Sequence, residues 1–185
     1  IYYLVSVSDS NGCANAVSNQ SVTITVNQLP NAVVTGTTAV CQNDSSPVIT
    51  LTGSNGVQNY SFTYNINGGS NQVISTSGSD TASVFAPSGI AGIYNYILVS
   101  VSDSNGCTQN QSGIATVTIN ELPTATLNGD ATVCQHDSPP VITFTGTNVT
   151  SPYSFTYTIN DGITPTDTNT VSSNGTVPIK PVNDP

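Results

Sequence analysis

Hydrophobic and polar residues alternate with a period of two in several short segments of the chain. Aromatic and aliphatic residues take every second position from Tyr60 to Ile66, and the same pattern returns from Tyr153 to Ile159. Because successive side chains of a β-strand point to opposite faces, each segment predicts a strand with one face in a core and the other in water. We therefore expect Phe62 and Tyr64 to be buried and Thr63 to be exposed.

Threonine fills many of the polar positions in the other alternating segments, where it favours a strand without adding charge. No window keeps the 3.6-residue spacing of an amphipathic helix over a useful length. The further segments that predict strands are Val22–Val26, Ile49–Leu51, Ala115–Ile119 and Ile142–Phe144.

The sequence also repeats itself. Gln28–Gly69 matches Glu121–Gly162 at an offset of 93, with 24 of 42 positions identical, and Tyr2–Cys13 matches Tyr96–Cys107 at an offset of 94, with 11 of 12 identical. A period of this length is too long for a solenoid repeat and suits a small β-sandwich domain.

Glycine-containing turns follow the predicted strands. Asp-Ser-Asn-Gly occurs at Asp9–Gly12 and again at Asp103–Gly106, and Asn67–Gly69 and Asp161–Gly162 end the aromatic segments. Asn-Gly favours a type I′ hairpin turn, in which both central residues have positive φ.

These patterns predict an all-β fold of Greek-key-type sandwiches in a row. We expect residues 1–29 to be the last strands of one repeat, 30–122 to be a complete repeat and 123–185 to begin a third. Leu29–Pro30 and Leu122–Pro123 lie at the joints, where a proline restricts the linker. Since the sequence begins within a predicted strand, without an initiator Met or a signal peptide, we expect it to belong to a longer chain.

Charge and hydropathy exclude several classes of function. The chain has a single cationic residue besides histidine, Lys180, against ten acidic residues, which gives a formal net charge of −9. Binding to nucleic acid or to an anionic membrane surface needs clustered cations. No apolar run reaches the roughly 18 to 20 residues that direct membrane insertion requires. Because only 6% of the residues are charged, the surface must be mostly neutral and polar, which favours a secreted protein.

Four cysteines occupy two pairs of corresponding positions, Cys13 with Cys107 and Cys41 with Cys134. They lack the close spacing of a metal site, so disulfides in an oxidising location are expected. We favour a structural disulfide between Cys41 and Cys107, because a repeat that closes its own bridge can fold alone during export. The alternatives, Cys13–Cys41 and Cys107–Cys134, would cross repeat boundaries.

The sequence offers no set of residues that fits catalysis or cofactor binding. The one histidine, His136, lies beside Asp137 in a predicted turn, and Asn43 takes its place in the other repeat. No second base is present for a Ser-His-Asp triad, and the scattered carboxylates form no pair suited to glycoside hydrolysis. We therefore expect no enzyme activity, no catalytic residue and no cofactor.

Calcium binding is the competing hypothesis for the acidic turns. Asp9–Gly12 resembles the start of a calcium loop, but its twelfth position is Gln20 instead of a bidentate Glu. Asp44 and Asp137 recur in register and would either ligate calcium or form Asx turns. We expect no metal site and keep calcium as the alternative.

The segment Leu98–Gln135, LVSVSDSNGCTQNQSGIATVTINELPTATLNGDATVCQ, resembles the PKD-like and Ig-like repeats of bacterial cell-surface proteins. Together with PVITFTG and YSFTYTIN, it is most similar to repeats of the giant gliding-motility adhesins that the type IX secretion system exports. The resemblance covers essentially all 185 residues. It implies tandem Ig-like or PKD-like antiparallel β-sandwich repeats, an extracellular location at the cell surface and adhesion to substrata.

Two classes of function are compatible with this sequence. The first is a structural and adhesive stalk, whose partners are the neighbouring repeats of the same chain and a surface polysaccharide or other substratum. The second is a carbohydrate-binding or enzyme-appended module, which needs an exposed aromatic platform. Trp is absent, and the Tyr and Phe residues fall mainly on the buried phase of the predicted strands, so the stalk is favoured.

Overall fold

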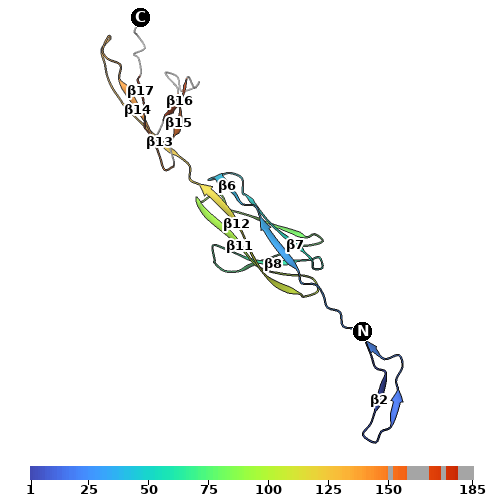
Figure 1. Ribbon diagram of the computed structural model, residues 1–185. Coiled ribbons are helices and arrows are strands. Elements are labelled where there is room, and N and C mark those ends of the chain that lie inside the picture. Colours follow the sequence, from blue (N-terminus) through green and yellow to red (C-terminus); the bar gives the residue numbers. More distant parts are fainter. Residues whose placement is uncertain (150–151, 158–166, 172–173, 179–185) are drawn as a thin grey trace. The chain divides into compact units, whose positions relative to one another are not determined.

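The computed structural model describes residues 1–149, 152–157, 167–171 and 174–178. Within these ranges the protein is all-β, and it holds no helix that could cross a membrane (Figure 1). The strands, in chain order, are β1 Tyr2–Tyr3, β2 Ser6–Ser8, β3 Ala14–Ala16, β4 Ser21–Val22, β5 Asn31–Thr35, β6 Thr38–Cys41, β7 Val48–Ser54, β8 Ser61–Ile66, β9 Gln72–Ser75, β10 Thr81–Phe85, β11 Gly92–Ser102, β12 Thr108–Asn120, β13 Thr124–Asn128, β14 Val141–Thr147, β15 Tyr153–Tyr157, β16 Asp167–Val171 and β17 Asn174–Pro178.

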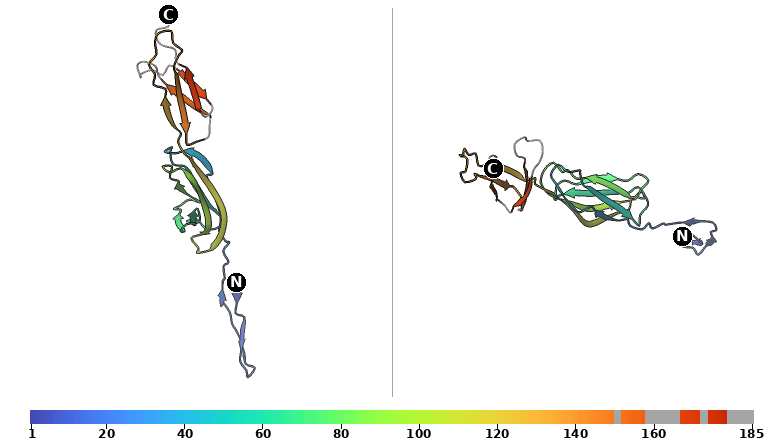
Figure 2. Two further views of the ribbon diagram at one scale, coloured as in Figure 1. Left: turned by 90° about the vertical axis from the view of Figure 1, so that its left-hand side faces the viewer. Right: turned by 90° about the horizontal axis from the view of Figure 1, so that it is seen from above.

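The strands between residues 31 and 120 form two sheets, with the orders β10-β7-β5 and β6-β12-β11-β8-β9. Figure 1 labels most of these strands, and Figure 2 shows them from two other sides. Their inner faces meet closely, since a Cβ atom added to Gly53 in β7 would come within 2.5 Å of the Tyr60 ring that precedes β8. The arrangement is consistent with a β-sandwich.

The core consists of the inward-facing residues of these two sheets. The largest fully buried side chains are Tyr96, Phe62, Ile49, Leu51, Leu98, Val101, Val117 and Pro30. Phe62 and Tyr64 are both buried, which confirms the predicted phase of β8. Thr63 is half-buried where we expected it to be exposed, because Val73 of β9 and Ser100 of β11 flank it on either side.

The pairing of β8 with β11 contains an irregularity that the alternation did not predict. The two strands are antiparallel, and their register shifts between Leu98 and Ser100. An extra residue in one strand is a β-bulge, which changes the face to which the following side chains point. Two successive inward residues of β11, Leu98 and Val101, are therefore three positions apart instead of two.

One strand pair departs from the antiparallel arrangement that the sequence predicted. β5 pairs with β7 in the first sheet, and the chain then crosses to the second sheet, where β6 pairs in parallel with β12. The parallel register joins Thr38 to Val117 and Cys41 to Asn120. β6 is only four residues long and has no clear alternation, so no local pattern predicted this pairing.

The predicted type I′ turn is correct at one of its sites and wrong at two others. Asn67 and Gly68 both have positive φ, 53° and 74°, and the N–H of Gly69 donates to the carbonyl of Ile66. In the Asp-Ser-Asn-Gly turns only the glycines, Gly12 and Gly106, have positive φ. These are three-residue loops that end in a left-handed glycine, a form that closes a hairpin with a bulge.

Residues 1–29 form two short ladders, β1 with β4 and β2 with β3. The predicted strand Val22–Val26 is formed only at Val22, and both Ile24 and Val26 are exposed. Their counterparts in β12 pair with β6. No such partner lies beside residues 23–26 in the described part of the chain.

Residues 124–178 contribute a sheet with the order β13-β14-β17 and a separate pair, β15 with β16. By internal packing the chain divides into two compact units, 1–36 with 48–84 and 95–115, and 37–47 with 85–94 and 116–185. This division does not test the boundaries expected near residues 29 and 122, which stay predictions. The predictions for Ile159, for the turn Asp161–Gly162 and for Lys180 lie outside the described residues.

The fully buried ring of Phe62 allows a direct test of the core. Phe62→Ala should lower the free energy of unfolding by about 3 to 5 kcal/mol, because it removes buried contacts and leaves a cavity. The matched control, Thr63→Ala on the adjacent residue, should cost less than about 1 kcal/mol. Urea denaturation measures both values, and equal losses would show that the faces of β8 are assigned wrongly.

Candidate functional site

The turn at Asp103 is the most highly organised polar feature of the described chain. Asp103 is buried, and one carboxylate oxygen, Oδ1, accepts hydrogen bonds from the N–H groups of Asn105 and Cys107, each over 3.0 Å. The other oxygen, Oδ2, accepts from the N–H of Val57 over 3.1 Å. Asp103 thus fixes its own turn and joins it to a loop 46 residues away in sequence.

These hydrogen bonds shift the pKa of the Asp103 carboxylate. The N–H of Val57 lowers the pKa of Asp103 most strongly, and the N–H groups of Cys107 and Asn105 lower it further. Burial opposes them, because removing a charged group from water favours its neutral form. The net pKa of Asp103 is lowered, so the folded protein favours the ionised carboxylate.

The other acidic turns repeat this structural use of a carboxylate. Oδ1 of Asp9 accepts from the N–H groups of Asn11 and Cys13, as Asp103 does in its own turn. Oδ2 of Asp44 accepts from the N–H of Cys41 over 3.0 Å, and Oδ2 of Asp137 accepts from that of Cys134 over 2.8 Å. Asp9 and Asp103 form Asx turns, because each accepts the N–H two residues further on. Asp44 and Asp137 instead accept the N–H three residues earlier, so they hold their turns without forming the Asx turn expected for them.

The same hydrogen bonds also bear on whether the aspartate turns can bind calcium. A calcium ion needs six to eight oxygen ligands, and the turn oxygens described above already accept backbone N–H groups. The described residues contain no group of three or more His, Cys, Asp or Glu side chains that could hold a metal. His136 has a φ of 69°, close to the 68° of its counterpart Asn43, so it occupies the left-handed position of a turn.

The structure does not bring Cys41 and Cys107 together. All four cysteines are free, so neither the expected bridge nor its two alternatives are formed. Cys41 is the register partner of Asn120, the last residue of β12, whereas Cys107 immediately precedes the first residue of that strand. An extended strand of this length separates the two cysteines by roughly 40 Å. A disulfide requires Cα atoms within about 7 Å, so the register of β6 and β12 opposes this bridge.

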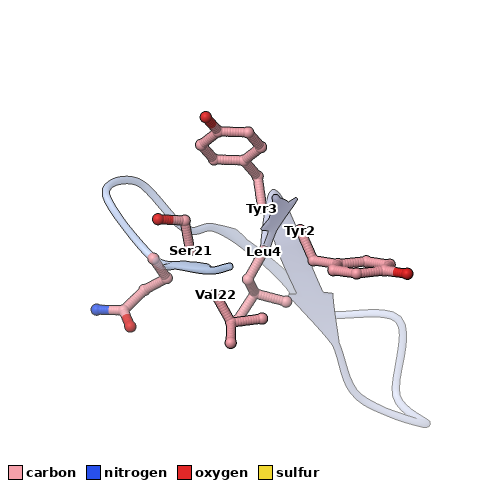
Figure 3. Close-up of a pocket in the computed structure, with 6 residues that line it drawn as sticks. Tyr2, Tyr3, Leu4, Ser21 and Val22 are labelled. Atoms are coloured by element: carbon pink, nitrogen blue, oxygen red, sulfur yellow. The ribbon is translucent and has the colours of Figure 1, made fainter. Parts of the chain in front are cut away.

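A pocket of about 380 Å³ lies on the short ladder near the N-terminus (Figure 3). Tyr2, Leu4 and Val22 line one face of the ladder, while Tyr3 and Ser21 lie on the other. The corresponding residues of the two central sheets, Tyr96, Leu98 and Ala115, are all buried in the core. Part of the pocket lining therefore consists of side chains whose counterparts are core, and the lining residues include no group suited to catalysis.

The repetition of the aspartate turns was visible in the sequence, but the hydrogen bond from the N–H of Val57 to Asp103 was not predicted. That bond depends on a contact between distant loops, and no local pattern reports it. The fold and the turns together define an all-β protein whose loops are held in shape by aspartate carboxylates. No known family model matches the chain, and no curated protein sequence matches it.

The lowered pKa of Asp103 predicts a pH dependence of stability. A lowered folded-state pKa stabilises the protein fully above the ordinary aspartate pKa, and this contribution is lost as the pH falls through the lowered value. Asp103→Asn should therefore flatten the loss of stability below about pH 4. Asp9→Asn is the matched control, because it changes the same kind of turn outside residues 30–122.

Urea denaturation of both variants between about pH 2 and pH 7 measures the effect. If the free energy of unfolding of the Asp103→Asn protein falls at low pH as steeply as that of the unaltered protein, the assigned role of this carboxylate is contradicted.

The exposure of the cysteines predicts their reactivity. Cys13, Cys41 and Cys134 are exposed and Cys107 is half-buried, so alkylation without reductant should label all four, with Cys107 the slowest. Peptide mapping by mass spectrometry identifies the labelled positions. Recovery of a Cys41–Cys107 disulfide peptide would show that the register of β6 against β12 is wrong.

Proposed function

We propose that the chain is part of a structural and adhesive stalk, built from tandem Ig-like or PKD-like β-sandwich repeats at the bacterial cell surface. The observation that carries the proposal is the repetition itself. Corresponding segments form corresponding strands, β5 and β13, β7 and β14, and β8 and β15, and their turns are fixed by corresponding aspartates. A unit that recurs with its strands and turn aspartates in the same places is suited to building length.

The strand order supports the Ig-like part of the proposal. The first stretch of chain after Pro30 is divided between the two sheets, so β5 joins β7 while β6 joins the last strand, β12. The remaining strands complete two sheets of three and five strands, in which β8 pairs antiparallel with both β11 and β9. This is the order of a Greek-key sandwich whose first strand changes sheets.

The surface supports an adhesive role that does not depend on charge. Outward positions carry mainly Thr, Ser and Asn, and only 6% of the residues are charged. Such a surface makes hydrogen bonds and van der Waals contacts to polysaccharide or another substratum. We place the chain in a secreted surface filament of the gliding-motility type, with neighbouring repeats as its permanent partners.

The sugar-binding alternative needs several exposed aromatic rings together on one surface of a repeat. Within residues 30–122, Phe85 is the one large aromatic residue with high exposure, at 68%. Tyr2 and Tyr3 are also exposed, but they lie on the short N-terminal ladder. A single ring gives no stacking platform, so the stalk is the better-supported function.

Adhesion should be insensitive to salt if the stalk makes uncharged contacts. Binding of the chain to glass and to polysaccharide-coated surfaces should change by less than about twofold between about 50 and 500 mM salt, where exposed charges become screened. Quartz-crystal microbalance measurements give the bound mass. A collapse of binding over this range would contradict the proposal.

Two controls identify the competing functions. Binding that disappears in Phe85→Ala would favour a sugar-binding site at that ring. Binding that chelator abolishes and calcium restores would favour the aspartate turns as a calcium site.

A further inference from the structure

β9 is the outermost strand of the five-stranded central sheet, and its outer edge has no neighbour among the described strands. On its inner side it pairs antiparallel with β8, in a register that joins Thr63 to Val73 and Ser61 to Ser75. Both strands lie within the central sandwich, far from either end of the sequence. The outer edge of β9 is therefore an edge of the complete sandwich.

The hydrogen bonds of this strand pair determine which backbone groups face the open edge. The N–H of Thr76, directly after β9, donates to the carbonyl of Tyr60 over 2.8 Å, so the backbone of Thr76 faces β8. Along an antiparallel pair, every second residue turns its N–H and C=O groups to the same neighbour. Ile74 therefore faces β8 as Thr76 does, whereas Val73 and Ser75 turn their N–H and C=O groups to the outer edge.

The side chains at this edge also favour further strand pairing. Val73 is a β-branched residue, and its side chain is 66% exposed. Ser75 lies on the same face of the sheet, where its hydroxyl donates to that of Ser61 over 3.0 Å. A β-branched side chain packs well against a cross-strand neighbour, and Val73 has such a neighbour on its inner side alone, in Thr63.

Open edges are usually protected against pairing by charged residues, by proline or by a bulge. β9 has none of these, because its sequence is Gln-Val-Ile-Ser and its register against β8 runs without a shift. Asp80 is the only charged residue between Asp44 and Asp103. That residue directly precedes β10, the edge strand of the other central sheet. β9 is therefore the edge at which two copies of this acidic chain meet with the least charge repulsion.

We propose that β9 of one copy of this chain pairs with β9 of a second copy, antiparallel and edge to edge, so that the two five-stranded sheets become one continuous sheet. The register places Val73 opposite Val73 of the second copy and Ser75 opposite Asn71. These residues then exchange the backbone hydrogen bonds that the open edge leaves available. Directly opposite side chains lie on one face, with roughly 5 Å between their Cβ atoms, so the two valines cover each other.

A second copy suits this edge because the edge is self-complementary. The same strand meets itself about a two-fold axis, so the contact uses up the β9 edge of both copies and closes at two. Backbone hydrogen bonds and the valine pair carry the association, since no ion pair is available to it. β9 has only four residues, so the association is weak and needs a high protein concentration.

The pairing also bears on the stalk. If the chain belongs to a surface stalk, a clause that rests on the proposed function, this contact would hold two stalks side by side. The dimer itself does not depend on that function. It is measured in solution without a surface, so failure of the dimer and failure of adhesion are separate outcomes.

Sedimentation equilibrium tests the association. The mass should rise from that of one chain toward that of two as the protein concentration increases to about 1 mM, a range that detects weak complexes. A mass of one chain over the whole range would overturn the proposal.

Val73→Asp should weaken the dimer by about tenfold or more, because two like charges would lie directly opposite each other in the contact. Ser83→Asp is the matched control: it adds the same charge to an exposed position of β10 and should leave the dimer unchanged. Both positions are exposed in the single chain, so both variants should stay folded. Association that survives Val73→Asp, or that falls equally in both variants, would overturn the proposal.

Val73→Pro tests the backbone pairing separately from the side-chain contact. Because the N–H of Val73 points away from β8, proline at this position removes no hydrogen bond of the repeat, but it removes one that the dimer needs. The variant should keep the urea unfolding transition of the unaltered protein and should not dimerise. Ile74→Pro is the contrast, since it removes a hydrogen bond to β8 and should lower the free energy of unfolding. A folded Val73→Pro protein that dimerises as before would overturn the proposal.

Amide hydrogen exchange locates the contact. At concentrations that favour the dimer, exchange of the N–H groups of Val73 and Ser75 should slow, because both become hydrogen-bonded across the new edge. Exchange at Ser83, on the edge of the other sheet, should not change. If the mass rises while exchange at Val73 stays the same, the dimer forms elsewhere and the proposal is wrong.

Discussion

The fold depends on one constraint: an apolar strand face is stable only when the opposite sheet covers it, and that sheet comes from another part of the sequence. β8 and β11 supply Phe62 and Tyr96, and β7 supplies Ile49 and Leu51 to the facing side. None of these segments has a core of its own. The side chains of Tyr96, Leu98 and Val101 are therefore buried, because the facing sheet covers them.

The neutral surface gives the few carboxylates a structural role. With little cationic partner charge available, the aspartates of the turns find their hydrogen-bond donors in the backbone. Asp103 and Asp44 each accept N–H groups of their own loops, and Asp103 also accepts one from Val57. This arrangement fixes loop shape without ion pairs, so loop geometry should persist across a wide range of salt concentration.

Local alternation predicted the strands and their inward faces, as Phe62 and Tyr64 show, because burial on one face leaves a two-residue pattern in the sequence. It could not predict the bulge beside Leu98 or the parallel pairing of β6, since both depend on neighbouring strands. The type I′ turn expected at Asn105–Gly106 is wrong because the Asp103 side chain stabilises a different loop. The placement of Cys41 far from Cys107 required the register of β12, which spacing along the chain does not report.

The parallel pairing of β6 with β12 has a mechanical consequence. The chain enters the two central sheets at Asn31 and leaves them after Asn120, the residue that pairs with Cys41. A pulling force applied through these two ends acts along the strand direction. The four register pairs from Thr38–Val117 to Cys41–Asn120 would then be loaded together, in shear, and would have to break at once instead of one after another. The short strand that the sequence did not reveal is thus the point at which tension would be resisted.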